Sequence, residues 1–298
     1  MVLTQLSTPL TRAQAFALVD AVMDREGLAI SAAAHESANG EWMFEATCDS
    51  EPDVAAFETL AAKILGGTVT FDAAVLPETD WVAKSLEGLK PVTAAGFYIY
   101  GSHHASLPPA GLTAIRIDAA EAFGTGHHAT TTLCLEALAA VLRRRRPRHV
   151  LDLGCGTGIL AIAAAKRLRR PVLATDIDPK AVAATVENAR INGVGHWVVA
   201  ARADGLNHPA IAENAPFDLI LANILAGPLC KLAPAMARRA APGATIVVSG
   251  LLETQAARVV AAYADNDMVL NKKAARDGWA ALILRKKRRT GPSGPGPG

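Results

Sequence analysis

Between residues 150 and 284, short apolar runs alternate with longer stretches in which apolar residues recur at helical spacing. Such alternation is typical of a doubly wound α/β fold, a mostly parallel sheet with right-handed crossovers. The pattern predicts seven strands, at 150–153, 172–175, 197–201, 219–222, 245–249, 268–275 and 279–284. The turn Arg276-Asp277-Gly278 joins the last two, so one of them must run antiparallel to its neighbours.

The first ninety or so residues follow a different order. Apolar spacing predicts helices at 11–25 and 54–65, with strands at 28–33, 41–47 and 69–74. Thr11-Arg12-Ala13-Gln14 has the sequence of a capping box at the start of the first helix. This order predicts a small α+β domain of the ferredoxin-like type. Substrate recognition is its favoured role, and a purely stabilising appendage is the alternative.

Composition shifts predict where the domains end. A short helix is expected at 80–89, and the glycine- and proline-rich stretch 91–112 resembles a connector with one strand at 97–100. We therefore expect a substrate-recognition domain at 1–90, a linker at 91–117 and a catalytic domain at 118–285. The basic, glycine- and proline-rich tail 286–298 carries too few apolar residues to order.

Composition excludes several classes of protein. A net charge of +2 gives little general attraction for nucleic acid, so no stable nucleic-acid complex is expected. Four scattered cysteines without a C-x-x-C pair disfavour a disulfide framework, and the adjacent His127 and His128 lack the spacing of metal ligands, so no metal site is expected. The N-terminus lacks a signal peptide and no apolar run spans a membrane, which predicts a cytoplasmic protein without a membrane partner.

The most informative motif is the glycine loop that follows the strand 150–153 and leads into a helix. Gly154, Gly156 and Gly158 form G-x-G-x-G, a turn whose backbone N–H groups and helix N-terminus can face a ligand. A dinucleotide-binding loop needs a third small residue where Ile159 stands, which disfavours an NAD-dependent oxidoreductase. The loop is therefore expected to bind another adenosine-containing cofactor.

Two polar residues end neighbouring strands at the same edge. Asp176 lies about 20 residues beyond the glycines, where an acid can bind ribose hydroxyls, while Asp178 is expected to cap the helix that begins at Pro179. Asn223 ends a later strand, and its amide oxygen can accept a hydrogen bond from a substrate N–H and so direct the nitrogen lone pair at an electrophilic methyl group. The alternatives are a glycine turn with a capping acid and no ligand, and a turn or cap role for Asn223.

Two further segments carry two interpretations each. The glycine-threonine loop 122–132 can close over the cofactor, or Thr130 or Thr131 can simply cap the following helix. The run Arg143–Arg146 follows a predicted helix at 130–142, where positive charge stabilises the helix C-terminus; RNA contact is the less favoured alternative.

Taken together, four motifs resemble the ribosomal protein L-eleven methyltransferase family (PrmA type): A-F-G-T-G at 122–126, G-C-G-T-G-I-L at 154–160, D-I-D-P at 176–179 and N-I-L-A-G-P-L at 223–229. The resemblance implies a protein-lysine N-methyltransferase that uses S-adenosylmethionine. Its substrates would be the terminal α-amine and lysine ε-amines of a large-subunit ribosomal protein, free or on the ribosome. It also implies a monomer whose N-terminal domain swings to present different amines.

The resemblance also implies roles for particular residues. Asn223 would be the catalytic residue, and the cofactor-binding positions would be Phe123, Thr131, Gly154, Gly156, Gly158, Asp176, Asp204 and Asn223. His127 and Ala129 depart from the family's G-T-G-T-H-P-T-T loop, which weakens the transfer to Thr131. The alternatives are a methyltransferase acting on another protein or nucleic-acid amine, and a non-catalytic ribosome-associated binding protein. No aromatic residue follows Asn223 to stack a flipped base, which argues against a nucleobase substrate.

Overall fold

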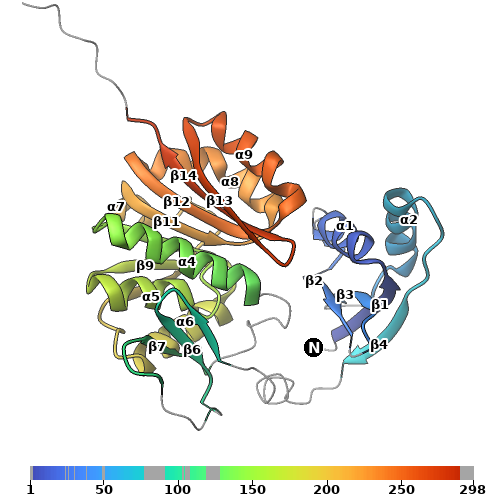
Figure 1. The fold of residues 1–298 in the computed structure, drawn as a ribbon. Coiled ribbons are helices and arrows are strands. Elements are labelled where there is room, and N and C mark those ends of the chain that lie inside the picture. Colours follow the sequence, from blue (N-terminus) through green and yellow to red (C-terminus); the bar gives the residue numbers. More distant parts are fainter. Residues whose placement is uncertain are drawn as a thin grey trace, which may run out of the picture. The chain divides into compact units, whose positions relative to one another are not determined.

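The computed structural model describes residues 3–76, 91–118 and 128–288, apart from residues 24, 26, 30, 38, 49–50, 103 and 105–107. The chain divides into two compact units, Met1–Trp81 and Val82–Gly298, whose elements are labelled in Figure 1. Within the described ranges, no helix combines the length and the apolar character needed to cross a membrane.

The smaller unit has a ferredoxin-like βαββαβ order. Its elements are β1 (Leu3–Leu10), α1 (Arg12–Met23), β2 (Ser31–Glu36), β3 (Trp42–Cys48), α2 (Val54–Leu65) and β4 (Asp72–Leu76). The strands lie in the order β2-β3-β1-β4, and every neighbouring pair is antiparallel. The ferredoxin-like prediction is confirmed, but the sequence analysis missed β1, which is a central strand of this sheet.

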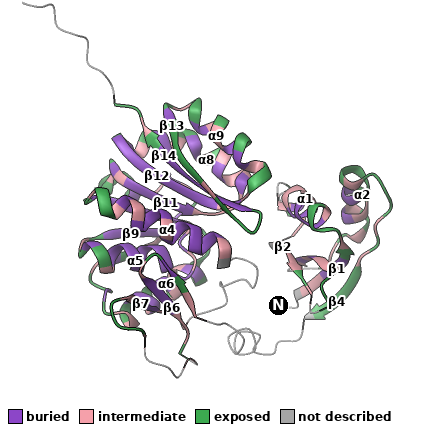
Figure 2. Cartoon of the chain, viewed as in Figure 1, coloured by how far each residue is buried: buried purple, intermediate pink, exposed green. Residues whose placement is uncertain are grey.

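One apolar cluster stabilises this unit. Leu6 of β1, Leu18 of α1, Phe44 of β3 and Phe57 of α2 are completely buried and belong to it. The predicted capping box is present, because the Thr11 N–H donates to Gln14 Oε1 at 3.1 Å and the Gln14 N–H donates to Thr11 Oγ1 at 3.4 Å. Figure 2 shows the buried side of the helices in purple.

The larger unit contains all seven strands that the apolar pattern predicts. They are β8 (Val150–Leu153), β9 (Val172–Asp176), β10 (Val198–Arg202), β11 (Phe217–Asn223), β12 (Ala240–Leu252), β13 (Met268–Arg276) and β14 (Trp279–Lys286). Their order in the sheet is β10-β9-β8-β11-β12-β14-β13. Only β14 runs antiparallel to β12 and β13, which confirms the predicted hairpin and the doubly wound, mostly parallel sheet.

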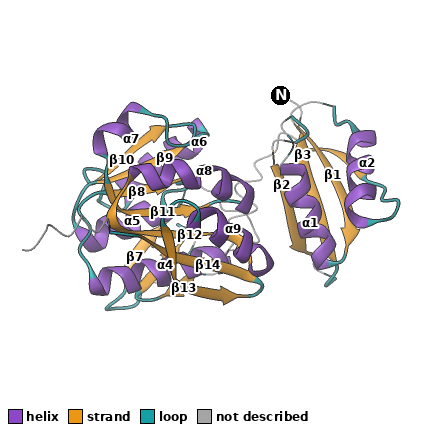
Figure 3. Ribbon diagram, turned by 90° about the horizontal axis from the view of Figure 1, so that it is seen from above, coloured by secondary structure: helices purple, strands orange, loops and turns teal. Residues whose placement is uncertain are grey.

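Helices cover both faces of this sheet (Figure 3). α4 (His128–Arg144), α5 (Ile159–Leu168) and α6 (Pro179–Ile191) pack on one face; α7 (Pro209–Asn214), α8 (Ala226–Arg239) and α9 (Ala256–Ala264) pack on the other. Successive residues of a strand point to opposite faces. In β11, Leu219 and Leu221 therefore enter one core while Ile220 and Ala222 enter the other.

The segment 91–117, which we expected to be a linker, forms part of the larger unit. It contains β5 (Val92–Ala94), β6 (Phe97–Tyr100) and β7 (Thr113–Arg116), which build a three-stranded sheet. Phe97, Ile99 and Ile115 are buried in the same apolar core as α4 and α5, so the linker interpretation is corrected here. The helix expected at 80–89 and the tail beyond residue 288 lie outside the described residues.

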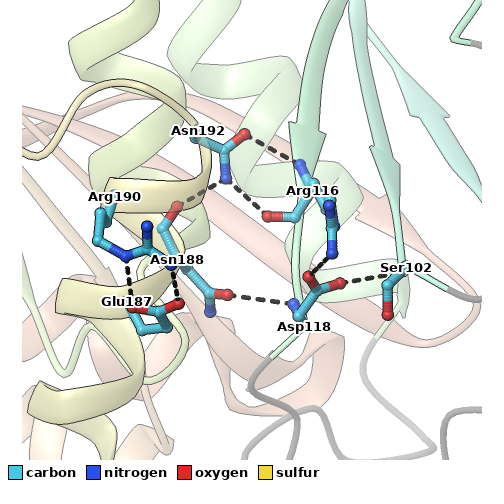
Figure 4. A network of polar contacts seen from close by, with 7 residues as sticks. All are labelled: Ser102, Arg116, Asp118, Glu187, Asn188, Arg190 and Asn192. Carbon is cyan, nitrogen blue, oxygen red and sulfur yellow. Dashed lines mark hydrogen bonds and ion pairs between the residues drawn. The ribbon is translucent and has the colours of Figure 1, made fainter.

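A polar network fastens the end of β7 to α6 (Figure 4). The Arg116 N–H donates to Asn192 Oδ1 at 3.0 Å, and Asn192 Nδ2 donates back to the Arg116 carbonyl at 2.6 Å. The Asp118 N–H donates to Asn188 Oδ1 at 3.1 Å, while the Asp118 carboxylate accepts from the Ser102 N–H and pairs with Arg116. The chain is therefore held in place just before the glycine-threonine loop.

Candidate functional site

A cavity of about 250 Å³ lies at the carboxyl edge of the large sheet, where β8 and β11 end. That edge is where open α/β sheets bind ligands. Its walls come from three parts of the chain far apart in sequence: Thr130 and Thr131 of α4, Asp152, Gly154 and Gly156 of β8 and the glycine loop, and Asn223 of β11. The fold thus brings together the main residues that the motifs predicted.

The glycine loop requires glycine for two different reasons. Gly154 has a φ of +69°, and a Cβ there would lie only 2.3 Å from Ile224 Cγ2. Gly156 has a φ of +54° and faces open space, so a ligand can approach its backbone closely. Gly158 does not line the cavity; it is the N-cap of α5 and faces Thr185 of α6, so its predicted cofactor contact is replaced by helix packing.

The backbone N–H groups of this loop are already hydrogen-bonded. Those of Gly154 and Cys155 donate to the Thr175 carbonyl at 2.8 and 3.0 Å, and that of Gly156 donates to Asp176 Oδ2 at 2.9 Å. The expectation that these groups face a ligand is therefore wrong for residues 154–156. They tie the loop to the end of β9, and the loop offers a ligand space and carbonyl oxygens instead.

Asp176 ends β9 and holds the loop through both carboxylate oxygens. Its second oxygen, Oδ1, accepts from the Asp178 N–H at 3.0 Å. Each carboxylate oxygen has a further acceptor position, so a ribose hydroxyl can still bind. Asp178 accepts from the Lys180 N–H at 2.8 Å with Pro179 in the first helical turn, which confirms its predicted capping role. Asp204 is exposed just after β10 and does not line the cavity.

Asn223 presents an unusual amide oxygen to the cavity. Its Nδ2 donates to Thr130 Oγ1 at 3.5 Å. Its Oδ1 is buried and has no hydrogen-bond partner among the described residues. A buried polar atom left without a partner destabilises a protein by roughly 1–3 kcal/mol, so such atoms are usually satisfied by a ligand or by water. This oxygen is placed to accept a hydrogen bond from a bound molecule.

Asp152 is the residue that the sequence analysis missed. Its side chain is buried in the cavity wall; Oδ2 accepts from the Ala161 N–H of α5 at 2.8 Å, and Oδ1 has no partner in the described part of the chain. Burial raises the pKa of Asp152 to about 7; the Ala161 hydrogen bond opposes this rise, and the charge of Asp176 adds to it. An acid within the otherwise apolar V-L-D-L strand was the available signal.

α4 and α6 hold the loop and complete the site. Thr130 and Thr131, in the first turns of α4, are buried and line the cavity. Behind the loop, Asn188 Nδ2 donates to the Thr157 carbonyl and Thr185 Oγ1 donates to the Gly156 carbonyl, both at 2.9 Å. Phe123 and the rest of its loop lie outside the described residues. Among the residues that are described, no cluster of three or more His, Cys, Asp or Glu side chains can hold a metal ion.

Comparison with known proteins decides the family. The family model described as ribosomal protein L11 methyltransferase (PrmA) matches residues 9–287 of this chain. The chain belongs to the PrmA family. The match begins within β1, so PrmA relatedness extends over the smaller unit as well as over the motif-bearing region.

Individual relatives agree with this assignment. A ribosomal protein L11 methyltransferase of Rhodopseudomonas palustris is 47% identical over 259 residues, which cover 86% of this chain and 88% of the relative. One of Mesorhizobium japonicum is 45% identical over 91% of this chain and 93% of its own length. Among solved structures, a ribosomal protein L11 methylase of Lactobacillus delbrueckii matches 67% of this chain with a TM-score of 0.60 and 29% identity. The PrmA resemblance seen in the motifs is confirmed.

Proposed function

We propose that this protein transfers methyl groups from S-adenosylmethionine to amines of ribosomal protein L11 in the cavity at the carboxyl edge. The family assignment supports the substrate and the reaction. The observation that ties the reaction to this cavity is the buried, unpartnered Oδ1 of Asn223 beside the glycine loop.

The cavity residues fit the cofactor. Gly156 leaves room for a nucleoside against its backbone, and Asp176 keeps acceptor positions for ribose hydroxyls. The Asp152 carboxyl, in the wall between them, is placed to neutralise positive charge. When bound, S-adenosylmethionine supplies a methyl group on positively charged sulfur, which is already strongly electrophilic.

The residues of this chain then have two tasks. The first is orientation: Asn223 Oδ1 accepts a hydrogen bond from the substrate amine, and Thr130 holds the amide by accepting from its Nδ2. The second is deprotonation: an exposed lysine has a pKa of about 10.4 and must lose a proton to attack. Ile224 and Leu225 supply apolar wall beside Asn223, and removal of water there lowers the pKa of the amine.

The finer parts of the proposal concern the substrate. We infer that the modified groups are the terminal α-amine and lysine ε-amines of L11, free or on the ribosome, and that the enzyme is a monomer. The smaller unit is the recognition module, supported by its separate core and its lack of any part of the cavity lining.

The decisive experiment uses the full chain with labelled S-adenosylmethionine and large-subunit proteins from cells that lack this activity. Label is expected on L11 alone, and mass spectrometry of its peptides locates the amines. Label on a different protein or on RNA would favour the alternative of another substrate. Cofactor binding without any labelled product would favour a non-catalytic binding protein.

A further inference from the structure

A second surface of the larger unit is concentrated in arginine. Two hollows of about 550 and 500 Å³ adjoin each other and share Arg145 and Arg146. We call them together the arginine groove, defined by Arg144, Arg145, Arg146, Arg148, Arg167 and Arg288. They come from the C-terminal end of α4 and the segment after it, from α5, and from the end of the chain after β14.

The positive charge of this groove is not neutralised locally. Asp218 is the one acid that lines either hollow, and its Oδ2 accepts from the backbone N–H groups of Arg148 and His149. None of the six arginines forms an ion pair with another residue that the structure describes. Elsewhere in the unit, by contrast, Arg276 pairs with Glu136 and Arg190 with Glu187.

The walls of the groove are built rather than loose. Arg145 donates to the Gly243 carbonyl at 2.7 Å, and Arg167 donates to the Gly96 carbonyl at 2.9 Å while lying 4.7 Å from the centre of the Phe97 ring. Burial lowers the pKa of Arg145, and repulsion from Arg285 and Arg288 lowers it further. These contacts fix guanidinium groups in place within a surplus of positive charge, while Arg144 and Arg146 remain exposed.

The groove is separate from the methyl-transfer cavity. Arg148 precedes the first residue of β8, and Gly243 lies in the first part of β12, so the groove is at the amino edge of the sheet. The cavity is at the carboxyl edge. Changes in the groove therefore leave the reacting groups untouched.

We propose that the arginine groove binds the phosphodiester backbone of RNA. Planar guanidinium groups match phosphate oxygens in two-point hydrogen bonds. Two adjoining hollows with a single acid suit a chain of uniform negative charge, whereas a folded acidic protein brings charges of both signs. This inference rests on the proposed function in one respect, since a ribosomal substrate places RNA near the enzyme.

The test compares two double variants of the full-length enzyme. Arg144→Gln with Arg146→Gln removes two exposed guanidiniums of the groove; Arg238→Gln with Arg258→Gln removes two exposed charges on α8 and α9 as the matched control. Binding of a short fluorescent RNA hairpin is followed by anisotropy over a range of salt concentrations, with a poly-glutamate peptide as the second probe. Methyl transfer to free L11 is measured on the same samples.

We expect the groove variant to bind the hairpin about tenfold more weakly than the unmodified protein and to reduce the salt dependence by about 1.4 in log–log slope, roughly 0.7 for each lost phosphate contact. The control variant should match the unmodified protein. Three results overturn the proposal: no salt-dependent RNA binding, an equal loss in the control variant, or tighter binding of poly-glutamate. Loss of RNA binding with full methyl transfer separates this proposal from the proposed function.

Discussion

At the scale of single residues, Asn223 and Asp152 show how burial changes what a polar group can do. Both side chains line the cavity, and both expose an oxygen there that has no partner within the described residues. The amide stays neutral and can only accept or donate hydrogen bonds, whereas the carboxyl can also gain a proton, because burial raises its pKa to about 7. The two residues therefore make different testable contributions.

Replacing Asn223 by Ala is expected to lower kcat for L11 methylation by about 100-fold, since misplacing a reacting amine by an ångström has an effect of that size. The Kd for S-adenosylmethionine, measured by calorimetry, should stay close to that of the unmodified protein. Asn207→Ala changes an exposed asparagine outside the cavity lining and serves as the control. Undiminished turnover in Asn223→Ala would remove this residue from the mechanism.

Replacing Asp152 by Asn should change how stability depends on pH. Because folding raises the pKa of this carboxyl from 3.8 to about 7, ionisation destabilises the folded state increasingly as pH rises through that range, and no further above it. Relative to the unmodified protein without cofactor, the variant should gain up to about 4 kcal/mol in free energy of unfolding between about pH 4 and pH 7. Urea titrations at several pH values measure this gain.

Asp204→Asn provides the comparison, because that carboxyl is exposed and its replacement should shift stability little at any pH. A constant difference between Asp152→Asn and the unmodified protein across the same pH range would show that the buried carboxyl does not titrate there.

At the scale of elements, the glycine loop is held from two sides. β9 accepts its N–H groups through Thr175 and Asp176, and α6 donates to its carbonyls through Thr185 and Asn188. Asn188 also accepts from the Asp118 N–H, so one side chain connects the loop with the segment after β7 (Figure 4). α6 thereby fixes both the loop and the chain that leads toward the glycine-threonine loop.

Replacing Asn188 by Ala should destabilise the protein by about 2–3 kcal/mol, because the Thr157 carbonyl and the Asp118 N–H both lose their partner. Affinity for S-adenosylmethionine should fall as the loop loses one support. Urea unfolding and calorimetry measure the two effects. Asn214→Ala, which removes one exposed hydrogen bond to Ala210 in α7, is the control; equal stability of the two variants would contradict this role for α6.

At the scale of the whole molecule, two units with separate cores share one chain. The smaller unit contributes no residue to the lining of the cavity, although the family model spans both units. A unit with its own core and no part in the cavity suits recognition of a protein substrate, which offers a surface much larger than the amine itself.

Hydrogen exchange of the full chain tests this division of labour. Addition of L11 should slow exchange of backbone amides within Met1–Trp81, whereas addition of S-adenosylmethionine should slow exchange mainly in the glycine loop and at the end of β11. A ribosomal protein that is not methylated serves as the control. Protection by L11 confined to the larger unit would assign recognition to that unit instead.

Local patterns were sufficient for much of this protein. The strands of the large sheet, the capping roles of Thr11 and Asp178, and the shared edge of Asn223 and Asp176 follow from periodicity, turn chemistry and strand direction. These features depend on residues close in sequence or on the rule that parallel strands end at one edge. The PrmA motifs, being contiguous, could likewise be identified from the sequence by itself.

Only the tertiary structure decided the remaining features, because they depend on contacts between distant segments. β1 is a strand because it pairs with β3 and β4, and the expected linker is part of a core because Phe97 and Ile115 find apolar partners there. The N–H groups of the glycine loop are occupied because β9 lies beside them. The pKa of Asp152 rises because the fold buries it, and burial cannot be seen from neighbours in the sequence.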